Sequence, residues 1–266
     1  MSTQTNPFSV FTKPWHTPLP ELAAFVKSLG FDGIELPVRP GYQVPPENVS
    51  RGLPEAVKIL GDFGLKIYSI AGTTDEATIA ACAEQGIHII RIMADIGDEG
   101  YMATVQKHWR EFDLLLPTLE RYGVKVGVQN HCGKMVCNAM GLRHLLERYD
   151  PNRIGAIWDA AHNALQGEEP EMALDIIWSH LLMVNLKNAV WQNLVGPEAE
   201  SAGWGIWWTG GRHGLASWRR VAEELKHRKY GGVVCLTAEY SDEKSVDRLI
   251  GEDVFFAKSL FLGYSN

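Results

Sequence analysis

Short apolar runs alternate with amphipathic segments along almost the whole chain. The runs have the length of buried β-strands, and the segments between them carry apolar residues at helical spacing. The pattern predicts eight strands, at residues 8–12, 33–36, 66–71, 87–93, 124–129, 154–159, 181–186 and 233–238. It predicts helices at residues 19–29, 52–63, 75–85, 101–122, 142–149, 170–179, 215–229 and 242–262. Strands that alternate with helices in this way form a parallel sheet.

The size of the chain and its first turn distinguish two parallel architectures. Eight strand–helix units in 266 residues match the usual size of a (β/α)8 TIM barrel. An open doubly wound sheet normally has a glycine-rich phosphate turn after its first strand. The corresponding turn here, residues 13–18, contains no glycine. No linker or low-complexity segment divides the chain, so we predict a single TIM barrel domain over residues 1–266.

Four predicted strands in the second half of the chain end on, or just before, a polar side chain: Gln129, Asp159, Asn185 and Glu239. A parallel barrel gathers the C-terminal ends of its strands at one mouth, so these side chains should face a common site. A carboxylate after the apolar run 233–238 is costly to bury unless it is paired or functional. Carboxylates are ligands for a divalent cation, and amides supply oxygen without charge.

Two more polar residues follow the same strand ends. His162 lies three residues after Asp159 and can present an imidazole to the same mouth, although Asp159 as a helix cap beside a surface histidine is the alternative. Lys187 lies two residues after Asn185 and therefore on the same face of the strand. It is a candidate acid–base or anion-binding group, and a lysine extended along the surface is the alternative.

Glu35 and His131 are candidate substrate contacts. Glu35 lies near the end of the second predicted strand, where a carboxylate either contacts substrate or belongs to a buried ion pair. His131 follows two other polar residues after the fifth predicted strand, so at least one of the three side chains points into the mouth.

Residues 204–214 have the most unusual local composition. Three tryptophans, four glycines and an Arg-His pair predict a flexible loop. Aromatic stacking with polar anchors is a usual way to hold a carbohydrate, so Trp208 and Arg212 are candidate substrate contacts, as is Trp15 after the first strand. Exposed tryptophan and arginine are also enriched at interfaces, so a contact within a homodimer or homotetramer is the alternative for this segment.

Charge and cysteine usage exclude several classes of protein. The net charge of −7 and the absence of a Lys/Arg run argue against a nucleic-acid partner. No apolar stretch of spanning length predicts a membrane segment, and the N-terminus does not resemble a signal peptide. The cysteines do not have zinc-site spacing, so we expect reduced thiols in a cytoplasmic protein. They are Cys82, Cys132, Cys137 and Cys235.

These segments together resemble the sugar phosphate isomerase/epimerase family, the xylose isomerase-like TIM barrels related to xylose isomerase and endonuclease IV. The resemblance covers nearly the whole chain and is carried by residues 31–36, 127–131, 158–162 and 237–240. It implies a divalent metal held by Glu, Asp, His and Glu at the positions of Gln129, Asp159, Asn185 and Glu239. Amides at two of these positions reduce the ligand charge, which favours Mn²⁺ or Mg²⁺ over Zn²⁺.

The resemblance also implies an isomerase or epimerase that acts on a small sugar or keto-sugar through an enediolate. Gln129 cannot accept a proton at neutral pH, so a one-base route remains. In that route Glu239 takes the proton, and Lys187 or His162 polarises or protonates the oxygen. Substitution of Glu239 by glutamine should then abolish turnover. Two alternatives stay open: a lyase or hydratase acting on a keto-glycoside by β-elimination, and a non-catalytic sugar-binding barrel with a degenerate metal site.

Overall fold

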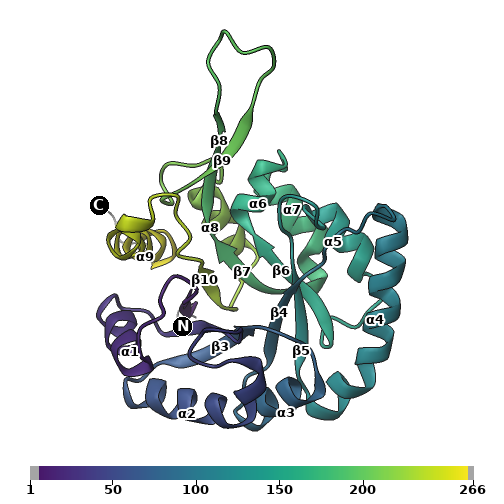
Figure 1. Cartoon of the computed structure of the whole chain (residues 1–266), viewed down its shortest axis with the longest axis vertical. Coiled ribbons are helices and arrows are strands. Elements are labelled where there is room, and N and C mark those ends of the chain that lie inside the picture. Colours follow the sequence, from purple (N-terminus) through teal and green to yellow (C-terminus); the bar gives the residue numbers. More distant parts are fainter. Residues whose placement is uncertain (1–5, 263–266) are drawn as a thin grey trace.

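The computed structural model describes residues 6–262 and confirms the (β/α)8 TIM barrel, xylose isomerase-like in architecture (Figure 1). Eight parallel strands close in the order β1-β10-β7-β6-β5-β4-β3-β2. The strands are β1 (Phe8–Phe11), β2 (Gly33–Pro37), β3 (Lys66–Ala71), β4 (Ile89–Met93), β5 (Lys125–Gln129), β6 (Ile154–Asp159), β7 (Leu181–Leu186) and β10 (Val234–Leu236). Closure occurs between the first and last of them, where Ser9 is in register with Cys235.

Helices surround the barrel on its outer side (Figure 1). They are α1 (Leu19–Ser28), α2 (Val49–Asp62), α3 (Glu76–Glu84), α4 (Tyr101–Tyr122), α5 (Ala139–Leu146), α6 (Ala160–Leu165), α7 (Pro170–Ile177), α8 (Trp218–His227) and α9 (Val246–Leu262). The short turns η1 (Pro46–Asn48), η2 (Trp178–His180) and η3 (Glu243–Ser245) complete the connections. The starts of α2, α5, α8 and α9 differ from the prediction by three or four residues. Polar caps set two of these starts: Asn138 accepts from the amide of Gly141, and Ser217 from that of Arg220.

Alternation along the strands places the polar residues at the mouth. Ile157 and Met183 belong to a small apolar cluster of buried residues contributed by β1, β3, β6, β7 and β10. The residue two positions further along each strand shares its face, and these residues are Asp159 and Asn185. The interior therefore changes from apolar to polar as the strands reach their C-terminal ends.

Helix α6 and the two strands of a hairpin were not among the elements predicted from the sequence pattern. Strands β8 (Asn188–Asn193) and β9 (Trp204–Thr209) form an antiparallel hairpin that projects from the barrel (Figure 1). The prediction of a flexible loop over 204–214 is wrong for residues 204–209. Their aromatic side chains favour extended structure. The partner strand, however, is separated from them by ten residues, and no short sequence motif indicates that the two segments pair. The homodimer or homotetramer stays a prediction.

Two further expectations from the sequence concern membrane-spanning helices and the cysteines. Among residues 6–262, no helix is long and apolar enough to cross a membrane. The cysteines are all free thiols, and three of them are buried: Cys82, Cys132 and Cys235.

Candidate active site

A cavity of about 760 Å³ lies at the C-terminal ends of the barrel strands. Five of the residues selected from the sequence line it: Trp15, His131, Lys187, Trp208 and Glu239. Four others are almost completely buried within the barrel or in the first helix after β6: Gln129, Asp159, His162 and Asn185. The structure therefore brings these nine side chains to one end of the barrel.

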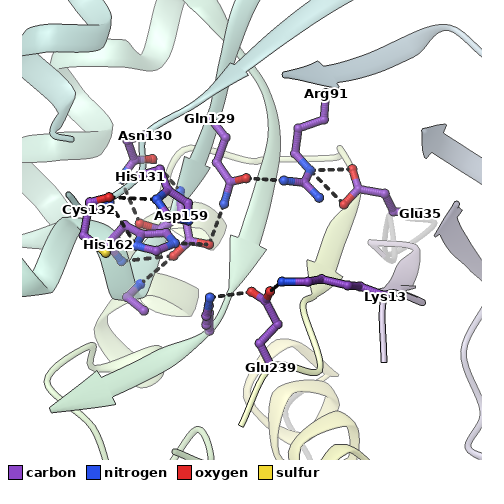
Figure 2. A network of polar contacts seen from close by, with 12 residues as sticks. Lys13, Glu35, Arg91, Gln129, Asn130, His131, Cys132, Asp159, His162 and Glu239 are labelled. Carbon is purple, nitrogen blue, oxygen red and sulfur yellow. Dashed lines mark hydrogen bonds and ion pairs between the residues drawn. The ribbon is translucent and has the colours of Figure 1, made fainter. Parts of the chain in front are cut away.

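Glu239 lies between two ammonium groups. It follows Ala238, which has a left-handed backbone (φ 52°) that turns the chain directly after β10. Lys13 donates to one carboxylate oxygen of Glu239 (Figure 2), and Lys187 donates to the other. Burial acts to raise the pKa of this carboxyl, but the two ammonium charges outweigh it and hold the pKa well below its usual range. Both oxygens of Glu239 are thus occupied.

Lys187 is a buried cation rather than a surface lysine. Its side chain is 4% exposed, and its Nζ lies 3.6 Å from the centre of the Trp208 ring. The tryptophan face attracts the ammonium group, and Glu239 supplies its counter-charge. Trp208 reaches this position because β9 pairs with β8, so the unpredicted hairpin supplies one wall of the site.

A chain of polar contacts connects residues on four strands of the barrel, β2, β4, β5 and β6 (Figure 2). Arg91 donates from Nε to both carboxylate oxygens of Glu35, each at 2.9 Å. Its Nη1 donates to the amide oxygen of Gln129. The amide nitrogen of Gln129 then donates to Oδ2 of Asp159 at 2.9 Å. Glu35 is therefore the counter-ion of a buried arginine, which is one of the two roles the sequence allowed.

Asp159 ends β6 and caps α6. Its Oδ1 accepts hydrogen bonds from the amides of Ala161, at 3.0 Å, and His162, at 3.1 Å. Burial raises the pKa of its carboxyl to about 6, although the positive charge of Lys187 and the two amides act in the opposite direction. This carboxyl therefore changes its charge near pH 6.

Asp159 is expected to destabilise the fold as the pH rises. The pKa is about 6 in the folded protein and about 3.9 in an unfolded chain, so the folded state binds more protons between these values. The stabilisation is fully present below about pH 4 and is lost as the pH rises through about 6, a change of about 3 kcal/mol. Urea unfolding of Asp159→Asn from about pH 4 to about pH 8 should lack this decline.

Comparison of wild type with Asp159→Asn isolates the contribution of Asp159 to the pH dependence of stability. The pKa of Asp253 is also raised to about 6, chiefly by burial, so the wild-type curve alone contains more than one such group. Identical pH slopes of the unfolding free energy for wild type and Asp159→Asn would contradict the prediction.

His131 and His162 are neutral and have opposite tautomers. Nδ1 of His131 lies 2.8 Å from the carbonyl oxygen of Cys132 and must donate to it, which leaves a lone pair on Nε2. Nδ1 of His162 accepts from the amide of Cys132 at 3.2 Å, so its proton is on Nε2. Burial lowers the pKa of both imidazoles, and the charge of Lys187 acts in the same direction. One ring is thus a base and the other a hydrogen-bond donor.

At three of the four positions implied for a divalent cation, the ligand atoms are already engaged by other side chains or by backbone amides. The oxygen of Gln129 accepts from Arg91, and an N–H of its amide faces Asp159. Both oxygens of Glu239 accept from ammonium groups. Asn185 differs, because both of its amide atoms are buried without a hydrogen-bond partner among the described residues.

The carboxylates at the mouth already have cationic side chains beside them. Lys13, Arg91 and Lys187 lie next to Glu35, Asp159 and Glu239, and Arg39 adds a further positive charge beside Arg91. A divalent cation would add positive charge where each available carboxylate already has a cationic neighbour. The residues present therefore do not fit a Mn²⁺ or Mg²⁺ site.

A second group of ligand-type atoms occurs beside the first. One ligand atom each of His131, Cys132 and His162 lies within 4.8 Å of the others. Both Nδ1 atoms are engaged in hydrogen bonds with the backbone, and Nε2 of His162 carries the proton. Burial raises the pKa of the Cys132 thiol, which disfavours the thiolate that a metal needs. This cluster does not fit a metal either.

Two important residues were missed from the sequence, and one selected residue lies elsewhere. Lys13 follows β1 and Arg91 lies within β4, so each had the signal used for the others: a charged side chain at or inside an apolar strand. Arg212 does not line the cavity, and its guanidinium stacks on the ring of Phe256 at 3.8 Å. Trp15 lines the cavity with its Nε1 donating to Asp247 at 2.7 Å.

Glu35→Gln is expected to lower the free energy of unfolding by about 3 kcal/mol, because it leaves the buried charge of Arg91 without its counter-ion. Urea denaturation measures this change. The matched control is Glu243→Gln, which removes a carboxylate at the cavity rim that forms no ion pair with a described residue. Unchanged stability of Glu35→Gln would contradict the ion-pair role.

Comparisons with known proteins agree with the barrel. A family model described as xylose isomerase-like TIM barrel matches residues 23–260. Among curated proteins, no relative matches the sequence. D-psicose 3-epimerase from Clostridium cellulolyticum H10 superposes with a TM-score of 0.72 and 13% identity, over 96% of this chain and 99% of that one.

Two further solved structures have the same fold. The apo form of 3-keto-D-glucoside 4-epimerase from E. coli gives a TM-score of 0.72 at 14% identity, over 96% of this chain and 99% of that one. The probable 3-DHS dehydratase of petrobactin synthesis from Bacillus anthracis gives 0.69 at 15% identity, over 98% and 100%. At such low identity these likenesses establish the fold alone.

Proposed function

The chain belongs to the xylose isomerase-like TIM barrel family, and from this premise we propose that it is an isomerase- or epimerase-like enzyme acting on a small sugar or keto-sugar. Its reaction removes a proton next to a carbonyl group and passes through an enediolate. The observation that carries the proposal is a neutral imidazole with a free lone pair, at His131, in the same cavity as the ammonium groups of Lys13 and Lys187.

His131 is the base in this proposal. Glu239 was the base expected from the sequence, but ion pairs occupy both of its oxygens and its lowered pKa makes it a weak proton acceptor. Nε2 of His131 accepts no hydrogen bond from a described residue. The imidazole takes the substrate proton, and the electron pair of the broken C–H bond forms the double bond of the enediolate.

The developing negative charge goes to the former carbonyl oxygen. Lys187 and Lys13 supply positive charge at the cavity wall, and Glu239 keeps both ammonium groups together. Nε2 of His162 carries a proton and forms no hydrogen bond with a described residue, although Oδ2 of Asp159 lies 4.0 Å away. It is therefore a buried donor beside the ring of His131. Stabilisation of an oxyanion by such preorganised groups is commonly the largest contribution to catalysis.

Deuterium exchange tests this function. Ketohexoses and 3-keto-glucosides are incubated with the protein in D2O, and proton NMR follows loss of the hydrogen next to the carbonyl. We expect one exchanged position, with a new epimer or isomer appearing at a comparable or slower rate. No exchange with any member of the panel would contradict the proposal and leave the non-catalytic sugar-binding barrel.

Chelation is expected to leave the reaction unchanged. The Mn²⁺ or Mg²⁺ site implied by the resemblance is not part of the proposed chemistry, because the residues at its positions are paired with one another and with cationic groups. Exchange rates before and after EDTA treatment, with added Mn²⁺ as a second comparison, should agree within about twofold. Loss of exchange on chelation, with recovery on Mn²⁺ addition, would contradict a metal-independent mechanism.

A lyase is the second candidate, because the cavity presents one free base. Interconversion of epimers commonly uses a base on each face of the substrate, and the fifth-strand position that would hold the second is the amide Gln129. β-Elimination from a keto-glycoside needs one base and one electrophile. Release of the glycosidic alcohol from 3-keto-glucosides, measured by NMR in the same experiment, would identify the lyase.

A further inference from the structure

Arg39 and Arg91 lie side by side at the mouth, next to the catalytic cavity. Their guanidinium carbons are 5.5 Å and 4.4 Å from the centre of the Phe11 ring. Both line a second cavity of about 320 Å³, formed by the segments that follow β2 and β3 and by β4. Two like charges that share an aromatic ring repel each other unless an anion lies between them or nearby.

Only one of the two arginines forms an ion pair with a described residue. Glu35 pairs with Nε of Arg91. Arg39 forms no ion pair and no side-chain hydrogen bond with any described residue. Asp95 also lines this cavity, but it pairs with neither arginine within the described chain.

Arg91 also has an unused hydrogen-bond donor. Its Nε and Nη1 donate to Glu35 and Gln129, whereas Nη2 is buried and has no acceptor among the described residues. The side chain is only 5% exposed. A buried donor of a charged group without an acceptor is costly, so a position that keeps one commonly receives an acceptor from a ligand or from water.

The second cavity lies close to the candidate active site. The segment after β2 contributes Arg39 to one cavity and Tyr42 to the other. The amide of Tyr42 donates to the carbonyl of Arg39, which ties the two positions together. The charge of Glu239 acts on both Arg39 and Arg91, which places both arginines within electrostatic reach of the catalytic centre.

We propose that Arg39 and Arg91 form an anion subsite that binds a carboxylate or phosphate group of the substrate. The inference rests on the proposed function, because it names the substrate class of the same site: an acidic sugar whose carbonyl end lies at His131 and Lys187. Guanidinium groups suit this task because their planar set of donors matches the oxygens of a carboxylate or a phosphate. The opposite rim of the catalytic cavity carries Glu243 and Asp247, so the acidic group has one favourable orientation.

Matched pairs of sugars test the subsite by binding alone. Calorimetric titrations compare glucose, galactose and mannose with the corresponding hexuronates and hexose 6-phosphates. We expect at least one acid to bind about tenfold or more tightly than its neutral partner, and its affinity to fall as salt is added. The two acidic series distinguish a carboxylate site from a phosphate site. Equal affinity of acid and neutral sugar in every pair would overturn the proposal.

Variants localise the preference. Arg39→Met should remove the preference for the acid by about tenfold while the affinity of the neutral sugar stays the same. Arg212→Met is the matched control, because Arg212 stacks on Phe256 outside both cavities and should leave both affinities unchanged. Thermal unfolding confirms that each variant is folded. An acid preference that survives in Arg39→Met would overturn the assignment.

The binding result and the catalytic result can fail independently. Absence of deuterium exchange with every substrate would contradict proton abstraction, whereas a charge preference lost in Arg39→Met would still establish the anion subsite. Deuterium exchange without any preference for acidic sugars would support proton abstraction and overturn the anion subsite.

Discussion

Replacing His131 with glutamine is expected to slow deuterium exchange by about two to four orders of magnitude, the usual effect of losing a general base. The hydrogen bond from Nδ1 to the carbonyl of Cys132 leaves the Nε2 lone pair free in the cavity. Glutamine can keep a donor near that carbonyl but cannot take a proton at neutral pH. Nearby Glu239 cannot substitute for the lost base, since Lys13 and Lys187 occupy its oxygens.

The pH profile gives the second test of His131. The imidazole must be neutral to act as a base, so the wild-type exchange rate should rise with pH and level off above the pKa of His131. Burial and the charge of Lys187 both lower this pKa from its usual value of 6.5. His227→Gln, on the exposed end of α8, is the matched control and should exchange at the wild-type rate. A His131→Gln variant with more than a tenth of the wild-type rate would exclude this base.

Replacing Lys187 with methionine is expected to reduce exchange by about three orders of magnitude and to lower the free energy of unfolding by about 3 kcal/mol. The ammonium group is nearly fully buried against Trp208 and donates to Glu239. Its removal leaves one carboxylate oxygen without a partner. It also removes the positive charge that favours the ionised form of Asp159, so the pKa of that carboxyl should rise further.

A double variant separates the charge pair from packing. Lys187→Met combined with Glu239→Gln removes both charges, so it should recover part of the lost stability while remaining inactive. Lys134→Met, at a lysine whose side chain is 83% exposed, is the control for a lost surface charge. Wild-type stability and exchange in Lys187→Met would show that this ammonium is neither a structural counter-ion nor an electrophile. Urea unfolding and NMR exchange provide both readouts.

Much of the candidate site was predictable from strand periodicity. Alternation along β7, continued to the residue after it, places Met183, Asn185 and Lys187 on one inward face, and the burial of all three is in accord with it. Asp159 caps α6 through the amides of Ala161 and His162, which is the helix-cap alternative, but His162 is buried and not on the surface as that alternative required. These relationships are contained within a few residues, so no long-range information is needed to find them.

The partners of these groups were not predictable from the same patterns. In the sequence, Arg91 is recognisable only as a charged residue inside an apolar strand. Its hydrogen bonds to Glu35 and Gln129 depend on how the strands are ordered in the barrel. The tautomers of His131 and His162 depend on one backbone peptide, at Cys132, whose orientation no sequence pattern specifies.

The sequence by itself determined the alternation of strands and helices, the closed barrel that follows from it, and the polar residues at the strand ends. Only the tertiary structure decided what each polar residue does. Lys13 meets Glu239 across 226 residues of chain because β1 and β10 are neighbours where the barrel closes. Trp208 reaches Lys187 because the unpredicted hairpin pairs Trp208 with Ala189, two residues after that lysine. Periodicity is a local property of the chain, whereas a counter-charge or a stacking surface comes from whichever distant segment packs alongside.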